Sequence, residues 1–279
     1  MVVGVVGVVG LAVGAAGCGF DPDGVPQLPR RPAQGAPTTT PPRDVSTRRI
    51  LAGAFMMGCN DGLAADCDDN EKPYHSVRLS PYEIDRTETT QSAYLACVGA
   101  GFCSMPMYMP VDPIDLGEYP VVGVTWTQAA QFCAWAGKRL PTEAEWERAA
   151  RGEDGRQWPW GNEAPSCERA NFMGCGEVLS ATGLSSRGAS PHGVLDMAGN
   201  AVEWVNDWYD PRGYAAAMAT DEDPQGPPTG VARVLRGGSY EGDARAVRTT
   251  QRSFEFPGWS FESVGFRCAR SIAPVENPE

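Results

Sequence analysis

The chain has few side chains that could perform chemistry: two histidines and nine cysteines among 279 residues. No two cysteines have the C-x-x-C spacing of common zinc and redox motifs, and His75 and His192 are too few for a histidine metal centre. The segment GLSSRG at 183–188 follows no strand, so it does not match a nucleophile elbow. Zinc, redox-motif and serine-nucleophile chemistry therefore have little support.

One glycine-rich segment, RGGSYEGDARAVR at 236–248, begins with Arg-Gly-Gly-Ser, which is typical of a segment that lines an active site. It contains no cysteine or histidine. Its Glu241 and Asp243 could act as an acid and base pair. A hydrated turn is the favoured interpretation of these two carboxylates. The alternative is an enzyme that uses them together with Arg236 and Arg248.

The cysteines instead indicate a disulfide framework. Setting Cys18 aside leaves eight of the nine cysteines, an even number that suits an exported protein. Proximity suggests pairs that close short loops, although sequence alone leaves other connectivities open. The suggested pairs are Cys59 with Cys67, Cys97 with Cys103, and Cys167 with Cys175.

The amino terminus resembles an export signal. Residues 1–17 carry no charge and form a stretch shorter than the roughly 20 apolar residues of a membrane span. Ala-Ala-Gly-Cys at 15–18 resembles the bacterial lipobox, which predicts a signal peptide over 1–18, lipidation of Cys18 and a membrane-anchored lipoprotein of the bacterial cell envelope. The basic residues usual at the start of a signal are missing, so an upstream start or an uncleaved anchor stays open.

Composition divides the rest of the chain. Residues 19–46 are rich in Pro, Thr and Gly and are predicted to be a disordered tether. A folded domain is expected over 47–272, followed by a tail over 273–279. The net charge of −12 argues against a nucleic-acid partner, since phosphate binding relies on clustered Lys and Arg. Neutral or cationic partners, including metal ions, are favoured.

The local patterns predict a loop-rich α+β fold with few regular elements, in line with 33 glycines and 24 prolines. TWTQAAQFCAWAG at 125–137 and PTEAEWERAARG at 141–152 each contain a capping-box pattern near the start and a glycine at the end, so each predicts a short helix. A third short helix is expected over 89–98, after a strand and turn over 75–89. Loops, short strands and turns are expected beyond Trp158.

Several separated motifs, in order along 50–270, resemble the formylglycine-generating enzyme family, also called sulfatase-modifying factors. The resemblance implies a fold related to C-type lectins, with mixed strands and much irregular chain. It also implies a disulfide between Cys133 and Cys268. The matching segments are FMMG, YEIDRTETTQSAY, PVVGVTWTQAAQFCAWAGKRLPTEAEWERAARG, WPWGNE, GVLDMAGNAVEW, RVLRGGSY and VGFRCAR.

The same resemblance implies that the family's oxidase chemistry is missing. In the working oxidases, two cysteines after RGGS hold a copper ion, which activates oxygen to convert a substrate cysteine into formylglycine. The matching positions here are Gly242 and Val247, and neither offers the thiolate that Cu(I) prefers. Copper is therefore not expected.

A calcium site is the one metal site that the resemblance implies. Its ligands would be main-chain oxygens of Ala198, Gly199 and Ala201, with Asn200 and the carboxylate of Glu203. Calcium binds such oxygen sets. A plain glycine turn with an exposed Glu203 is the alternative, and a second family calcium site near Asn171 lacks a clear acidic ligand.

A binding groove is the remaining expectation for the site. Arg236, Ser239, Tyr240 and Trp259 are predicted to line it and to receive a protein or peptide ligand. The sequence thus favours a lipid-anchored, non-catalytic binding or structural module. A diverged oxidoreductase of the same family, acting on a protein or peptide, is the alternative function.

Overall fold

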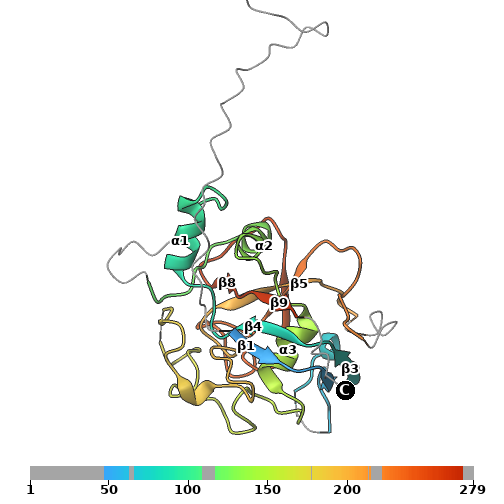
Figure 1. Ribbon diagram of the computed structural model, residues 1–279. Helices are drawn as coiled ribbons and strands as arrows, with labels where there is room; N and C mark the ends of the chain where they lie inside the picture. Colours follow the sequence, from blue (N-terminus) through green and yellow to red (C-terminus); the bar gives the residue numbers. More distant parts are fainter. Residues whose placement is uncertain are drawn as a thin grey trace, which may run out of the picture. The chain divides into compact units, whose positions relative to one another are not determined.

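The computed structural model describes residues 47–62, 66–108, 117–176, 178–212, 214 and 222–272 (Figure 1). The predicted signal peptide with Cys18, the tether and the tail lie outside these residues. Within the described part, the strands are β1 (Thr47–Ile50), β2 (Gly53–Met57), β3 (His75–Leu79), β4 (Tyr82–Asp85), β5 (Val202–Trp208), β6 (Arg233–Arg236), β7 (Arg252–Glu255), β8 (Val264–Phe266) and β9 (Ala269–Ser271). The α-helices are α1 (Gln91–Gly99), α2 (Trp126–Trp135) and α3 (Glu143–Arg151), and short 3-10 turns occupy Asp69–Glu71 and Ser186–Gly188.

Three small sheets carry the fold. One has the order β1-β4-β9, a second pairs β2 with β3, and the third has the order β7-β6-β5-β8. All neighbours are antiparallel except β5 and β8, which run parallel. Long irregular segments join the strands, as the glycine and proline content predicts. The expected loop-rich α+β fold is confirmed.

The two predicted capping boxes are present. Thr125 and Gln128 exchange side-chain and backbone hydrogen bonds at the start of α2, and Thr142 and Glu145 do the same at the start of α3. The chain then leaves each helix through a glycine with positive φ, 71° after α2 and 67° after α3. The third expected helix is α1, capped by Thr90.

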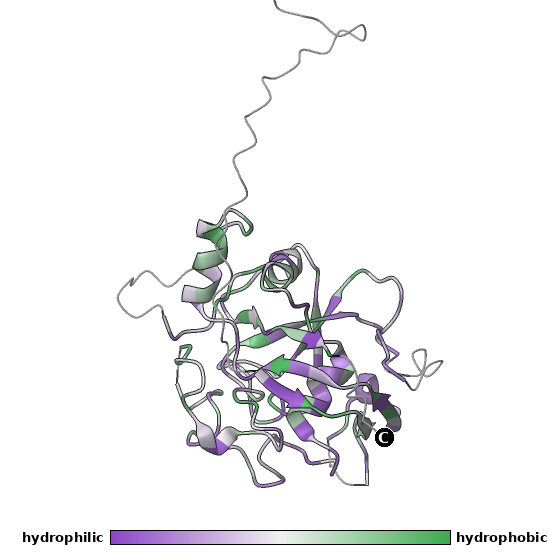
Figure 2. Cartoon of the chain, viewed as in Figure 1, coloured by the Kyte–Doolittle hydropathy of each residue, from purple (hydrophilic) through white to green (hydrophobic). Residues whose placement is uncertain are grey.

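The burial of helix α3 is unexpected, because the helix is strongly charged and yet buried along its whole length. Figure 2 colours it largely as hydrophilic, although strands and loops surround it. Ion pairs explain the burial: Glu147 binds Arg236 and Arg151, and Glu143 binds Arg252. Trp146, fully buried, lies on the same helix. The centre of the domain is therefore held by charge pairs as well as by apolar contact.

A second buried cluster lies between α1, α2 and β8. Tyr94, Phe132 and Phe266 form its centre, with ring centroids 5.4–6.3 Å apart. The fully buried disulfide Cys133–Cys268 crosses this cluster and closes 135 positions of chain. In the chain-entropy model, closing a loop of that length contributes about 4–5 kcal/mol.

All eight cysteines of the described residues are in disulfides. The three pairs suggested by proximity form, and so does the pair implied by the family resemblance. In the described part of the chain, every helix is too short or too polar to span a lipid bilayer.

Candidate functional site

The segment 236–248 leaves β6 through a double-glycine turn. Gly237 and Gly238 have φ of 95° and 65°, a region that side chains rarely enter. A Cβ at Gly238 would also lie 2.6 Å from the carbonyl oxygen of Ala246. The turn is fixed against Asn200, whose carbonyl accepts a 2.9 Å hydrogen bond from the Tyr240 amide. Glycine at these positions is thus required by the path of the chain.

The two positions that the resemblance assigns to copper ligands are built for packing. Val247 is fully buried in a small apolar cluster with Trp158, Ala170 and Ala198. Gly242 has no side chain, and its carbonyl accepts a 2.8 Å hydrogen bond from the Met173 amide. A Cβ at Gly242 would lie only 2.9 Å from the Cβ of Ala246. Because the described cysteines are all oxidised, that part of the chain has no thiolate for Cu(I), and these residues do not fit a copper ion.

Arg236 does not line a groove, so this prediction is wrong. The side chain is 0% exposed, and its guanidinium binds Glu147 at 2.5 Å. It also donates to the carbonyls of Thr249 and Thr250 at 2.8 and 3.0 Å. The buried position follows from the approach of α3 to β6, which the sequence does not reveal.

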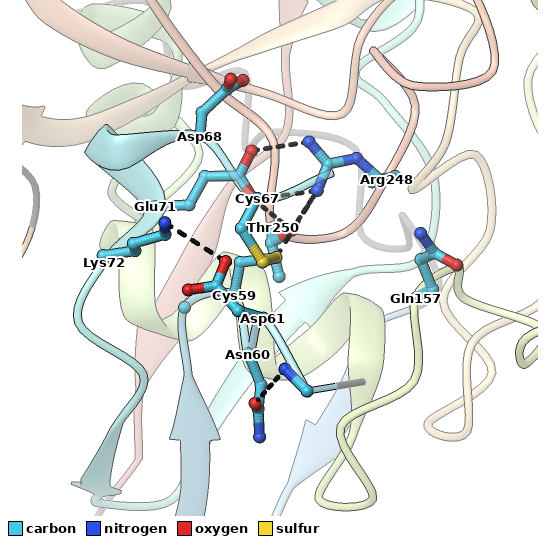
Figure 3. Close-up of a disulfide and its surroundings, with 12 residues drawn as sticks. Cys59, Asn60, Asp61, Cys67, Asp68, Glu71, Lys72, Gln157, Arg248 and Thr250 are labelled. Carbon is cyan, nitrogen blue, oxygen red and sulfur yellow. Dashed lines mark hydrogen bonds and ion pairs between the residues drawn. A yellow bond between two sulfur atoms is a disulfide. The ribbon is translucent and has the colours of Figure 1, made fainter. Parts of the chain in front are cut away.

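Arg248 is likewise a structural residue. It donates to both carboxylate oxygens of Glu71, at 2.7 and 3.0 Å, and approaches the sulfur of Cys59 at 3.7 Å (Figure 3). Thr250 donates to the same carboxylate at 2.7 Å. This arrangement ties the segment 236–248 to the disulfide loop Cys59–Cys67.

The alternative acid and base pair is not assembled. Asp243 caps its own turn, with one carboxylate oxygen accepting from the amides of Arg245 and Ala246 at 3.0 and 2.9 Å. Glu241 is exposed to solvent. With Arg236 and Arg248 buried in their own ion pairs, the four residues share no common site. The structure shows an exposed turn at these two carboxylates.

Tyr240 is the predicted groove residue that does face open space. It lines two neighbouring pockets of about 490 and 590 Å³. Burial raises the pKa of its hydroxyl, and the nearby carboxylates of Glu241 and Glu262 raise it further. The described lining of both pockets contains no Lys or Arg.

The other two predicted groove residues lie differently. Ser239 is 8% exposed, and its hydroxyl accepts a hydrogen bond from the Glu241 amide at 3.3 Å. Trp259 is 55% exposed and touches Phe256 and Phe261, but it is not among the residues that line either pocket. Of the four predicted residues, only Tyr240 therefore reaches the pockets.

The rest of the pocket walls comes from loops that the sequence analysis did not assign to the site. Tyr108, Tyr119, Val122 and Glu262 contribute to the larger apolar wall, and Met173–Gly176 contribute to the more polar pocket. These residues lie in loops, and their spacing in the sequence follows no recognisable motif. The chain brings them together only through the tertiary fold, so no local signal could have found them.

The two side chains among the implied calcium ligands, Glu203 and Asn200, are already bound by protein groups. Both carboxylate oxygens of Glu203 bind Arg267 at 2.7 Å, and one also accepts from the Trp146 indole at 2.9 Å. The side-chain oxygen of Asn200 already accepts from Ser180 and Asn171. Glu203 is fully buried, so the alternative of an exposed carboxylate is wrong. Within the described residues, no group of three or more His, Cys, Asp or Glu could hold a metal.

The glycine turn beside Glu203 has a structural reason. Gly199 has φ of 80°, and a Cβ there would lie 2.1 Å from the carbonyl oxygen of Asn171. That carbonyl accepts a 2.7 Å hydrogen bond from the Asn200 amide. The turn thus holds two distant loops together through this hydrogen bond.

Comparison with known proteins agrees with this architecture. The chain is 33% identical to a formylglycine-generating enzyme of Streptomyces coelicolor, over 86% of this chain and 94% of that protein. It is 36% identical to the inactive C-alpha-formylglycine-generating enzyme 2 of Bos taurus, over 81% and 88%. The solved Treponema denticola variable protein 1 superposes with a TM-score of 0.66 at 27% identity, over 81% of this chain and 95% of that one.

A family model also matches most of the chain. The sulfatase-modifying factor enzyme 1-like domain matches residues 33–272, which include every described element. The matched range therefore contains all of these helices and strands and the segment 236–248. The chain belongs to the sulfatase-modifying factor enzyme 1-like family.

Proposed function

We propose that this protein is a non-catalytic binding module that retains a peptide groove of its family without the oxidase chemistry. The observation that carries the proposal is the contrast between two parts of one segment. Gly242 and Val247 offer no side-chain metal ligand, and Val247 is packed in an apolar cluster. Tyr240, which precedes both in the sequence, faces two open pockets. A scaffold that loses its reactive groups but keeps its pockets can still bind.

The chemistry of the pockets favours an extended peptide over a small, deeply buried ligand. Both pockets are open and meet at Tyr240, so a ligand that fills both must be elongated. Aromatic and aliphatic side chains line one of them, which suits apolar side chains of a peptide. The inactive relative of Bos taurus, by its name, shows that this family contains proteins without the enzyme activity.

Replacing Tyr240 with Ala is expected to weaken peptide binding by about tenfold, because the aromatic surface that it presents to both pockets is lost. The probe is a fluorescent peptide with a sulfatase cysteine motif in which Ser replaces Cys, so that thiol exchange cannot mimic binding. Fluorescence anisotropy measures the affinity. Phe254→Ala is the matched control, since Phe254 is 50% exposed and lines neither pocket. Equal affinity of wild type and Tyr240→Ala would contradict the groove.

The location belongs to the same proposal: the module is exported and held to the bacterial cell envelope by a lipid on Cys18. The uncharged leader and the Ala-Ala-Gly-Cys sequence support it. Cys18→Ser is expected to move the protein from the membrane fraction to the soluble fraction or to block its processing. Mass spectrometry of the mature amino terminus checks this. An unmodified terminus elsewhere, with unchanged fractionation of the variant, would rule the anchor out.

A further inference from the structure

One disulfide differs from the other three in its access to solvent. Cys167 is exposed and Cys175 is half-buried. Each of the other disulfides contains at least one cysteine that is 3% exposed or less, namely Cys59, Cys97, and both Cys133 and Cys268. Since thiol exchange requires approach of a thiolate to a sulfur atom, Cys167–Cys175 is the most accessible of the four pairs, because Cys167 is exposed whereas Cys67 is half-buried and Cys103 is buried.

The loop that this disulfide closes forms a wall of the binding pockets. Met173, Gly174, Cys175 and Gly176 line the pocket of about 590 Å³, facing Tyr240 and Glu241. Val178 and Leu179, which follow closely along the chain, line the pocket of about 490 Å³ on the other side of Tyr240. A change in this loop therefore reaches both pockets.

Among the described residues, few contacts besides the disulfide position the tip of the loop, Met173–Gly176. The Met173 amide donates to the Gly242 carbonyl at 2.8 Å, and the Cys175 amide donates within the loop to Phe172. A Cβ placed on Gly174 would meet no atom within 4 Å. The base of the loop is firmer, because the carbonyl of Asn171 accepts from the Asn200 amide at 2.7 Å. Opening the disulfide would thus free the tip and leave the base in place.

We infer that Cys167–Cys175 is a redox modification site at which a dithiol reductant controls the binding pockets. The consequence for binding rests on the function proposed above. A thiolate of the reductant attacks the exposed Sγ of Cys167, the Cys167–Cys175 bond breaks, and Cys175 leaves as a thiolate. The second thiol of the reductant then attacks the mixed disulfide and releases Cys167. The reductant ends as a disulfide, and the protein gains two electrons and two protons.

The order of reduction tests the site itself. The folded protein is titrated with dithiothreitol, the free thiols are trapped with N-ethylmaleimide, and labelled peptides are identified by mass spectrometry. Cys167 and Cys175 are expected to be labelled at a reductant concentration about tenfold below that needed for the other pairs. Labelling of any other pair at the same or a lower concentration would overturn the inference.

Hydrogen exchange tests the effect on the pocket wall without any ligand. In the selectively reduced protein, the Met173 amide is expected to exchange about tenfold faster, while the Trp146 amide in α3 stays unchanged. Cys167→Ser/Cys175→Ser should reproduce this pattern without reductant. Unchanged exchange at Met173 in both samples would contradict the control of the pocket.

Peptide affinity separates this inference from the proposed function. Binding of the serine-containing peptide is expected to fall about fivefold on selective reduction, as ordering the loose wall opposes binding. If the peptide binds both forms equally, the redox inference fails and the binding module stands. If it binds neither form, the proposed function fails, and labelling and exchange still decide the redox site.

Discussion

Replacing Glu203 with Gln is expected to lower the free energy of unfolding by about 3–5 kcal/mol, because it leaves the buried Arg267 without its counter-charge. Glu203 on β5 binds Arg267 through both oxygens at 2.7 Å, and both residues are 0% exposed. Glutamine would also turn an amide group toward the donors of Arg267 and Trp146. Urea unfolding followed by tryptophan fluorescence measures the change.

A surface pair supplies the matched control for Glu203. Glu83 on β4 also pairs with an arginine, Arg270 on β9, but that arginine side chain is 51% exposed. Glu83→Gln is therefore expected to cost about 0–1 kcal/mol. Addition of a calcium chelator should not reproduce the loss seen for Glu203→Gln, since Arg267 and not an ion holds the carboxylate. A Glu203→Gln variant as stable as Glu83→Gln would contradict this role, and a chelator effect of similar size would restore the calcium interpretation.

The free energy of unfolding is expected to fall as the pH rises toward 8, because Asp207 is protonated in the folded state and loses this proton at high pH. Burial, together with the negative charge of Glu143, raises the pKa of Asp207 to about 8. The folded pKa lies above the unfolded value, so the folded state holds the proton more tightly. The contribution is complete below about pH 4 and is lost as the pH rises through the folded pKa, by up to about 1.4 kcal/mol per pH unit.

Asp207→Asn isolates this contribution from other titrating groups. The Asp207 oxygen that accepts from the Glu143 amide at 2.8 Å has an equivalent in Asn, which stays neutral at every pH. The free energy of unfolding is measured in urea from pH 5 to 8.5. The difference between variant and wild type is expected to grow by about 4 kcal/mol over that range in favour of Asn. A constant difference would show that Asp207 is ionised in the folded protein throughout.

Local signals in the sequence were sufficient for the helices. The capping boxes at Thr125 and Thr142 and the glycines that follow each helix act within a few residues, so their effect can be read without the fold. The disulfide Cys133–Cys268 joins positions far apart, and only the family resemblance predicted it.

The burial of charged residues could not be predicted from local patterns. Arg236 lies 89 positions from Glu147, and Arg248 lies 177 positions from Glu71. A charged helix such as α3 would be expected at the surface, because isolated charges are costly to bury. Only the tertiary arrangement supplies the partners, which is why Arg236 was placed in the groove and the burial of Glu203 was not foreseen.

Only the part of the site that lies in the motif itself could be predicted from the sequence. Gly242 and Val247 could be compared with the family motif position by position, and their side chains exclude copper ligation without any knowledge of the fold. Tyr240 followed from its place beside them. The opposing walls, including Tyr108, Tyr119 and the loop around Cys175, come from distant segments that only the folded chain brings together.

The most direct test of the account is the mass of a cysteine-containing sulfatase peptide after incubation with the purified protein, copper and oxygen. The account predicts an unchanged cysteine, because Gly242 and Val247 give copper no thiolate. The Streptomyces coelicolor formylglycine-generating enzyme, assayed in parallel, shows that the peptide and conditions permit conversion. Conversion of the cysteine to the formylglycine aldehyde above the no-protein control would contradict the non-catalytic function.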